Sequence, residues 1–320
     1  MRVILLGPQR RPTVDGVVRS MTRAGSLSPD GPIATITAGW QEREADDGEL
    51  STLLGGRGVN LALYRRWLDV QDRDPEYAAG ERQLREVLAE LQDIYLLRLD
   101  FGLQAVYAVQ RHESDELLEG RLRGGALAEA ITAVRELDTA HLRHVNTVRG
   151  EFLERLQPHD RPVIAEHRSA VAGILGDAPA LVLAGGHVGV LADVLHVFNI
   201  APALHPAAPR WPVIAWSAGA MALTDRIVLF HDRSPQGPGH PEVYGSGLSV
   251  LRDVVLLPHA RARMLLDDTP RMAVFARRFA PARCILLESG TRLDQGGNGG
   301  YPSGTRVLTE DGYVTSLEAA

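Results

Sequence analysis

Six short apolar runs, each bounded by glycine, proline or polar residues, are the feature that most constrains the fold of this 320-residue chain. Runs of this length and composition are typical of strands buried on both faces of a parallel sheet. Helical patterns separate several of the runs, and such alternation of strands and helices favours an α/β architecture built on a mostly parallel sheet. The six runs are residues 2–6, 33–37, 180–184, 213–215, 254–257 and 284–287.

The segment between the second and third runs has a different pattern. Apolar residues such as Leu84, Leu88 and Leu91 recur there at the spacing of amphipathic helices, with charged residues on the remaining faces. Because strands are predicted on both sides of this segment, we expect a helical insertion that leaves the sheet after the second strand and returns before Val163. The predicted division is residues 1–42 for the first part of the α/β core, 43–160 for the helical insertion and 161–320 for the remainder of the core.

The end of the chain has the pattern of a β-hairpin. Residues 305–309 and 313–317 flank an Asp311-Gly312 pair, and Asp-Gly is a favoured sequence for a tight hairpin turn. We therefore expect a C-terminal β-hairpin beside the α/β core.

Composition excludes several classes of function. The formal net charge of −6 and the lack of a basic block argue against a nucleic-acid surface and favour small-molecule or peptide partners. The apolar start of the chain is too short for a signal sequence and no run is long enough to span a bilayer, so we expect a cytoplasmic protein without a membrane partner.

The one cysteine, Cys284, excludes an internal disulfide, and its apolar neighbours indicate a buried structural thiol. This argues against a cysteine-dependent amidotransferase.

After the fourth run and Trp216 comes Ser217, which is followed by the small residues Ala218 and Gly219. This is the pattern of a nucleophile elbow, in which a sharp strand-to-helix turn presents a serine hydroxyl to substrate. The Ala218 N–H, at the start of the helix, is then placed to stabilise an oxyanion. The first glycine of the usual G-x-S-x-G motif is Ala215 here, so a tight turn that merely requires small residues is an alternative interpretation.

Three other predicted strands also end in residues that can take part in catalysis. Gly185 and Gly186 follow the third run, while His259 and Glu288 follow the last two. In an open parallel sheet, functional residues collect beyond the carboxyl ends of the strands. If these ends converge, Ser217 is the nucleophile, His259 exchanges its proton and Glu288 orients the imidazole. Gly186 and Ala218 would supply the oxyanion hole.

Alternatives remain open from the residues alone. The order serine, histidine, acid differs from that of the α/β-hydrolases, and a rival esterase of that fold would use Asp232 or Asp253 as its acid. The same hydroxyl and imidazole could transfer an acyl group to an amine instead of to water. A third class is a catalytically silent binding or scaffold protein, with the helical segment as its interaction surface.

Together these motifs resemble one family, the serine peptidases that comprise cyanophycinase and aspartyl dipeptidase (dipeptidase E). The resemblance rests on the segments 184–186, 216–220, 245–249, 259–263 and 287–292, which cover the C-terminal half in the family's order. It implies a flavodoxin-like, class I glutamine amidotransferase-like fold, with helices on both faces of the sheet. It also implies a Ser217, His259 and Glu288 triad, no metal, no cofactor, and hydrolysis of peptide or isopeptide bonds next to acidic residues.

The chain departs from the family pattern at three places. His187 stands where the family has an asparagine or an acidic residue, and Leu257-Pro258 replaces an Asp-Gln pair. The helical insertion has no counterpart in the short members, and it is compatible with capping the cleft or with forming a homo-oligomer.

Residues near the strand ends are candidates for binding an acidic substrate. Arg261 and Arg263 would project to the same side if their segment is extended, giving two guanidinium groups suited to carboxylates. Trp40 follows the second strand and is expected in the same cleft. The full set of predicted substrate-binding residues is Gly185, His187, Trp216, Arg261, Arg263 and Trp40.

Overall fold

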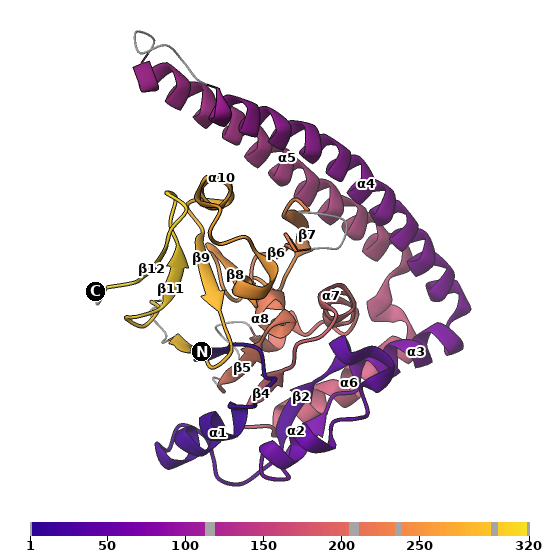
Figure 1. The fold of residues 1–320 in the computed structure, drawn as a ribbon. Helices are drawn as coiled ribbons and strands as arrows, with labels where there is room; N and C mark the ends of the chain where they lie inside the picture. Colours follow the sequence, from indigo (N-terminus) through magenta and orange to yellow (C-terminus); the bar gives the residue numbers. More distant parts are fainter. Residues whose placement is uncertain (1, 113–118, 205–210, 234–238, 296–299, 319–320) are drawn as a thin grey trace.

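The computed structural model describes residues 2–112, 119–204, 211–233, 239–295 and 300–318. An α/β body carries the strands, and a long pair of helices arches around one side of it (Figure 1). Within the described ranges, no helix combines the length and the apolar character that crossing a bilayer requires.

A six-stranded sheet forms the centre of the body, in the order β10-β1-β5-β4-β2-β3. Neighbouring strands are parallel except at the edge, where β10 runs antiparallel to β1. The first four apolar runs are strands of this sheet, which confirms the prediction of a mostly parallel sheet. The strands are β1 (Val3–Leu6), β2 (Ile33–Ile36), β3 (Gly58–Asn60), β4 (Leu181–Leu183), β5 (Val213–Trp216) and β10 (Arg292–Gln295).

Helices cover both faces of this sheet, as predicted. Side chains alternate between the two faces of a strand, so Val3 and Leu5 of β1 enter one apolar core while Ile4 and Leu6 enter another. The first core includes side chains of α3 (Leu63–Arg73), α6 (Pro162–Asp177) and α7 (Val188–Val197). The second core includes side chains of α1 (Val14–Arg23) and α2 (Gly48–Leu53).

The last two apolar runs form a separate sheet, so the expectation of one sheet for all six runs is wrong. The two strands, β8 (Val254–Pro258) and β9 (Arg283–Leu287), pair in parallel, and a C-terminal hairpin continues the sheet in the order β12-β11-β9-β8. The predicted hairpin is confirmed as β11 (Arg306–Leu308) and β12 (Val314–Ser316). Apolar runs identify buried strands, but they do not specify which strands are neighbours.

Outside the two sheets, the α/β body also contains one further helix, a two-stranded ribbon and two short 3₁₀ turns. Helix α10 (Thr269–Phe279) contributes to the apolar core beside β8 and β9. A two-stranded antiparallel ribbon consists of β6 (Arg226–Leu229) and β7 (Glu242–Ser246). Two single turns of 3₁₀ helix lie at η3 (Pro158–Asp160) and η4 (Ala201–Leu204).

The predicted insertion contains the two longest helices, α4 (Pro75–Arg111) and α5 (Glu119–Leu156), which pack against each other. It also contains β3, which adds an edge strand to the main sheet, so this segment is not purely helical. The proposed division of the chain at residues 42 and 160 stays a prediction.

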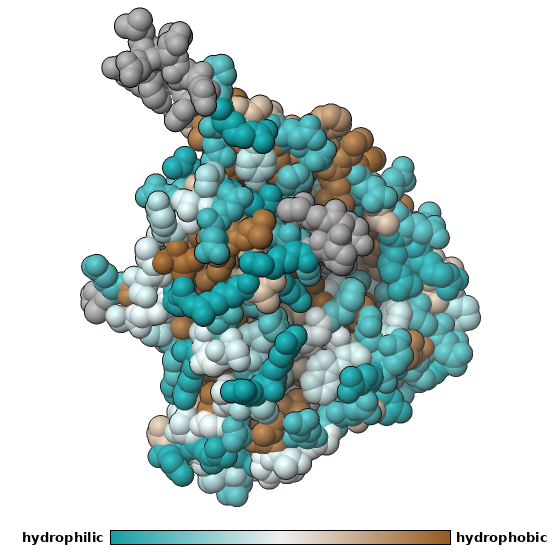
Figure 2. Space-filling model, viewed as in Figure 1, coloured by the Kyte–Doolittle hydropathy of each residue, from teal (hydrophilic) through white to brown (hydrophobic). Residues whose placement is uncertain are grey.

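Hydrophilic residues cover most of the face seen in Figure 2, with smaller hydrophobic patches between them. Leu97 and Phe101 of α4 are 61% and 64% exposed.

A buried polar network joins this helical hairpin to the body. Arg278 of α10 donates to both carboxylate oxygens of Asp138 on α5 at 2.7 Å, and to the Tyr95 hydroxyl of α4 at 2.9 Å. The same hydroxyl donates to Asp138 at 2.8 Å and accepts the N–H of Val243 in β7 at 3.0 Å. All three side chains are almost fully buried, so the hairpin is docked by a charge pair whose separation would expose an unpaired ion to an apolar interior.

Candidate active site

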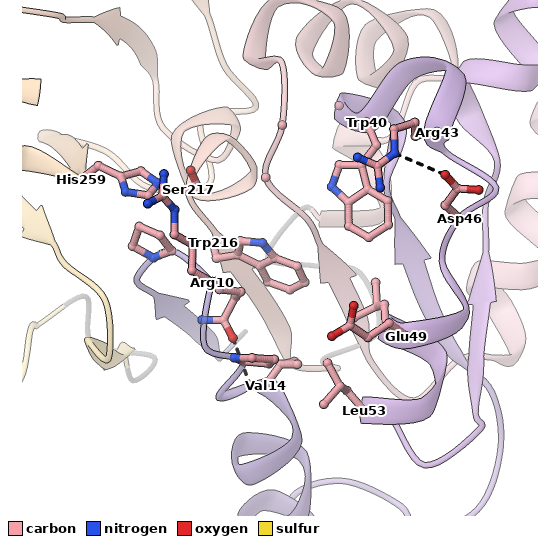
Figure 3. Close-up of a pocket in the computed structure, with 17 residues that line it drawn as sticks. Arg10, Val14, Trp40, Arg43, Asp46, Glu49, Leu53, Trp216, Ser217 and His259 are labelled. Carbon is pink, nitrogen blue, oxygen red and sulfur yellow. Dashed lines mark hydrogen bonds and ion pairs between the residues drawn. The ribbon is translucent and has the colours of Figure 1, made fainter. Parts of the chain in front are cut away.

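A cavity of about 510 Å³ opens at the carboxyl edge of the main sheet. Leu6 and Trp216 are register partners in the parallel strands β1 and β5, so the segments that follow them leave the sheet side by side. Both segments line the cavity, together with the turn after β4 and with η1 (Ala38–Arg43) and α2 (Figure 3). Its lining residues include Gln9, Arg10, Trp40, Arg43, Asp46, Glu49, Gly185, Gly186, Trp216, Ser217 and His259.

Ser217 lies on the predicted sharp turn between β5 and α8 (Ala218–Ala222). Its backbone has φ 51° and ψ −123°, a conformation that is costly for a residue with a side chain. Small neighbours are required here, because a Cβ on Gly185 would lie 2.9 Å from the Ser217 Cβ and one on Gly219 would lie 2.5 Å from the Leu183 oxygen. The half-buried Ser217 side chain therefore faces the cavity from a strained turn.

His259 lies between β8 and α9 (Ala260–Arg263) and lines the same cavity as Ser217. Figure 3 shows both side chains at one end of the cavity. Burial lowers the pKa of the His259 imidazole, and the positive charges of Arg263 and Arg10 lower it further, while the carboxylate of Glu288 opposes them. A lowered pKa keeps the ring neutral at neutral pH, the form that can accept a proton.

Glu288, at the end of β9, is close enough to act on the imidazole electrostatically. Its Oε1 accepts the backbone N–H of Arg261 at 2.8 Å, and among the described residues no hydrogen bond joins it to the His259 ring. In this conformation the carboxylate therefore holds the first turn of α9. The assignment of Glu288 as the residue that orients His259 stays a prediction.

The predicted oxyanion donors flank Ser217. Gly186 has φ 127°, and a Cβ there would lie 2.3 Å from the carbonyl oxygen of Gly39, so only glycine fits this turn. In the part of the chain that the structure describes, no backbone acceptor takes the N–H of Gly186 or that of Ala218. Both donors are therefore free to bind a substrate oxygen, and their role stays a prediction.

Ser217 and Gly186 also line a second cavity, of about 440 Å³. Its other walls come from β6, β7 and the turn at His259, and include His240, Glu242 and Arg263. Helix α4 supports this wall, because Gln92 donates to Glu242 at 2.8 Å and Asp100 lies 3.2 Å from the His240 ring. Ser217 therefore lies where two cavities meet.

The predicted substrate-binding residues are only partly brought together. Trp40, Gly185 and Trp216 line the first cavity and Arg263 lines the second. His187 lines neither of these two cavities. Its Nδ1 accepts the N–H of Val190 at 3.2 Å and caps α7.

The arginine pair is arranged differently from the prediction. Arg261 and Arg263 lie on the short helix α9, so the expectation that an extended segment projects them to the same side is wrong. Helical residues two apart are rotated by roughly 200°. Sequence reasoning also missed Arg10, an exposed side chain that lines the first cavity and makes no ion pair with any described residue. Its position directly after the first predicted strand was the one available signal, but the sequence does not show that this strand pairs with the one that carries Ser217.

The side chain of Asp232, one of the two rival acids, has other partners. The buried carboxylate of Asp232 accepts from Arg271 at 2.7 Å and from the Leu265 N–H at 3.1 Å, and it lines neither cavity at Ser217. Cys284 is buried as predicted, and burial raises the pKa of its thiol to about 12. The described residues contain no group of three or more His, Cys, Asp or Glu side chains that could hold a metal ion.

Comparison with known proteins gives little further information. No family model matches the chain, and no curated protein matches it. Among solved structures, it is similar to the crystal structure of a peptidase from an acI-B1 Actinobacterium. The match has 13% sequence identity and a TM-score of 0.46, and covers 99% of this chain and 94% of the other.

Proposed function

We propose that this chain is a serine hydrolase that cleaves peptide or isopeptide bonds, with a flavodoxin-like core of the class I glutamine amidotransferase-like type. The observation that carries the proposal is the conformation of Ser217, a non-glycine residue with φ 51° at the end of β5, in a cavity that it shares with His259. Backbone strain of this kind typically costs about 1–3 kcal/mol, and it concentrates at functional sites. A turn without a function would be more stable with glycine at this position.

The proposed reaction proceeds through an acyl-enzyme. Ser217 Oγ attacks the carbonyl carbon of the substrate while His259 accepts the hydroxyl proton. The oxyanion that forms accepts hydrogen bonds from the N–H groups of Gly186 and Ala218. Collapse of this intermediate breaks the C–N bond, and His259 returns the proton to the leaving amine. Water then attacks the ester with His259 as the base, which releases the acid and restores Ser217.

Arg10 gives a physical reason for preferring acidic substrates. It lines the cavity with no carboxylate partner among the described residues, whereas Arg43 in the same cavity lies 3.3 Å from Asp46. A substrate carboxylate next to the scissile bond would pair with the free guanidinium of Arg10. The proposed specificity is therefore for bonds next to aspartyl-type residues.

A catalytically silent protein of the same fold is the second candidate. It is favoured by the carboxylate of Glu288, which accepts the N–H of Arg261 and not a ring N–H of His259. In a silent protein, Ser217 would not react with an electrophile that requires an activated hydroxyl.

An active-site-directed fluorophosphonate tests these alternatives. We expect covalent mass on the peptide that contains Ser217, and its loss in Ser217→Ala and His259→Ala. Ser169→Ala, on the exposed surface of α6, is the matched control and should label like the wild type. Absence of labelling in folded protein would support the silent protein and contradict the hydrolase.

Turnover should then be measured on Asp-X dipeptides and β-linked aspartyl peptides. Loss of a triad nucleophile is expected to reduce kcat by about 10⁴-fold or more. An added amine acceptor separates hydrolysis from acyl transfer, because transfer gives a new amide product. Full activity of Ser217→Ala would exclude the assigned nucleophile.

A further inference from the structure

A third cavity, of about 850 Å³, lies between the helical hairpin and the body, and it shares no lining residue with the two cavities at Ser217. Helices α4 and α5 form one side, while α6, α7 and the end of β7 form the other. Ligand cavities in proteins are mostly apolar, with a few polar groups that fix the orientation of the ligand. Most of the exposed wall of this cavity is apolar surface, and polar or charged side chains supply the rest.

The apolar part of the wall comes from the hairpin. Leu84 and Leu88 of α4 face the cavity with Phe152 and Leu153 of α5. Leu153 is 49% exposed although it is a large apolar side chain. Removing such a surface from water would be favourable, by roughly 25 cal/mol for each Å² that a ligand covers.

Tyr77 provides an unused polar group. Its side chain is 1% exposed, it lines the cavity, and its hydroxyl makes no hydrogen bond with any described residue. The hydroxyl keeps some contact with solvent. A ligand atom that accepts its hydrogen bond would replace water at a site of low exposure, where a hydrogen bond is electrostatically stronger than in bulk water.

Arg168 of α6 provides an uncompensated positive charge at the same wall. Its Nε and Nη2 donate to the carbonyl oxygen of Val197 at 3.0 and 2.7 Å, and no described carboxylate forms an ion pair with it. By contrast, Arg149 in the same cavity is paired with Asp193 at 2.8 Å. Burial lowers the pKa of Arg168, and the side chains of Arg168 and Tyr77 line the same cavity.

We propose that this cavity binds a small carboxylate with an apolar body, such that the carboxylate pairs with Arg168 and accepts the Tyr77 hydroxyl. The apolar body then covers the surface formed by Leu84, Leu88 and Phe152. Two sources share this chemistry, a plain carboxylic acid and an amino acid with an apolar side chain. The carboxylates of Asp193, which pairs with Arg149, and of Glu81, which accepts the Trp67 Nε1–H at 2.9 Å, also line the cavity, and their negative charges would attract the ammonium group of an amino acid.

Calorimetric titration with three probes tests the proposal on the full chain. We expect 3-phenylpropionate to bind and 3-phenylpropan-1-ol, which lacks the carboxylate, to bind about tenfold more weakly or not at all. L-phenylalanine distinguishes the sources, because tighter binding than that of 3-phenylpropionate assigns an amino acid, and weaker binding assigns a plain acid. No binding of either carboxylate at millimolar concentration would overturn the proposal.

Variants locate the site. Arg168→Gln should raise the Kd of the bound carboxylate about tenfold or more, and Tyr77→Phe, which removes only the hydroxyl, about fivefold. Arg168→Lys keeps the charge and should recover part of the affinity. Arg143→Gln, an exposed change on α5 outside the cavity, is the control. Equal Kd values in the wild type and in both Tyr77→Phe and Arg168→Gln would contradict the site even if binding occurs. Because the readout is binding, it does not depend on the proposed hydrolase activity.

Discussion

The carboxylate of Glu288 accepts the backbone N–H of Arg261 at 2.8 Å, two residues beyond His259. This hydrogen bond fixes the turn that contains His259. The negative charge of Glu288 also raises the pKa of the His259 imidazole. Positioning the turn and stabilising the imidazolium are separate roles, and only the second requires a charged group. Glutamine can accept the Arg261 N–H but carries no charge, so this substitution separates them.

We expect the acid limb of kcat/KM to reflect His259 and to lie below the ordinary pKa of histidine, because burial and two arginines lower the pKa of this ring. Glu288 raises this pKa, so Glu288→Gln should lower it and move the acid limb to lower pH. Glu288→Ala also removes the acceptor of the Arg261 N–H and should reduce kcat further. The pH dependence of kcat/KM for the three proteins is the measurement. An acid limb that moves to higher pH in Glu288→Gln would be incompatible with the assigned electrostatics.

Arg10 should affect the same limb in the opposite direction. Its charge lowers the pKa of His259, so Arg10→Gln should raise this pKa and move the acid limb to higher pH. The variant should also raise KM for a substrate with an acidic side chain, by about two- to fivefold because the side chain is exposed. Arg11→Gln, an exposed change at the next residue outside the cavity, is the control. An equal change of KM for an uncharged substrate would contradict a role in binding the carboxylate.

The turn at Ser217 could be predicted because its signal is local. A β-branched strand followed by small residues specifies both the turn and the helix that begins after it. Arg10 was not found, since periodicity identifies β1 and β5 as strands without showing that they are neighbours. The separate sheet that contains β8 escaped prediction for the same reason. Strand β3 was missed because it has three residues that are half-buried or exposed at a sheet edge, so it has no continuous apolar run.

The backbone conformation of His259 could not be predicted from the sequence either. Its strand end was predicted, but the left-handed backbone conformation with φ 58° and the short helix after it were not. Left-handed conformations are uncommon for residues other than glycine, and the Leu257-Pro258-His259 segment contains no glycine. The bond from the His259 N–H to the Leu287 oxygen at 3.2 Å joins two segments distant in sequence. The residues next to His259 in the sequence therefore do not predict that bond.

Cys284 should have no part in the activity. Burial raises the pKa of its thiol to about 12, so almost no thiolate is present at neutral pH, and the thiolate is the reactive form. We expect Cys284→Ala to keep the turnover of the wild type while losing stability, because it leaves a small space in the core. A thiol-specific chromogenic reagent should react with the wild type only after unfolding. Rapid modification of the native protein accompanied by loss of turnover would contradict the serine assignment.

The docking of the helical hairpin should depend on Arg278. Its guanidinium and the carboxylate of Asp138 are almost fully buried, so Arg278→Leu leaves a buried charge without a partner. Removing one member of such a pair typically costs about 3–5 kcal/mol, whereas Tyr95→Phe should cost about 1.5–3 kcal/mol because it removes hydrogen bonds to the charged side chains of Asp138 and Arg278. Arg143→Leu, an exposed change on the same helix as Asp138, should change the free energy of unfolding by less than about 0.5 kcal/mol. Denaturant unfolding gives these free energies.

The double variant Arg278→Leu with Asp138→Leu should recover much of the loss, since both charges are then absent from the interior. If the double variant instead loses the sum of the two single losses, the pair is not coupled and the hairpin is held by its apolar contacts.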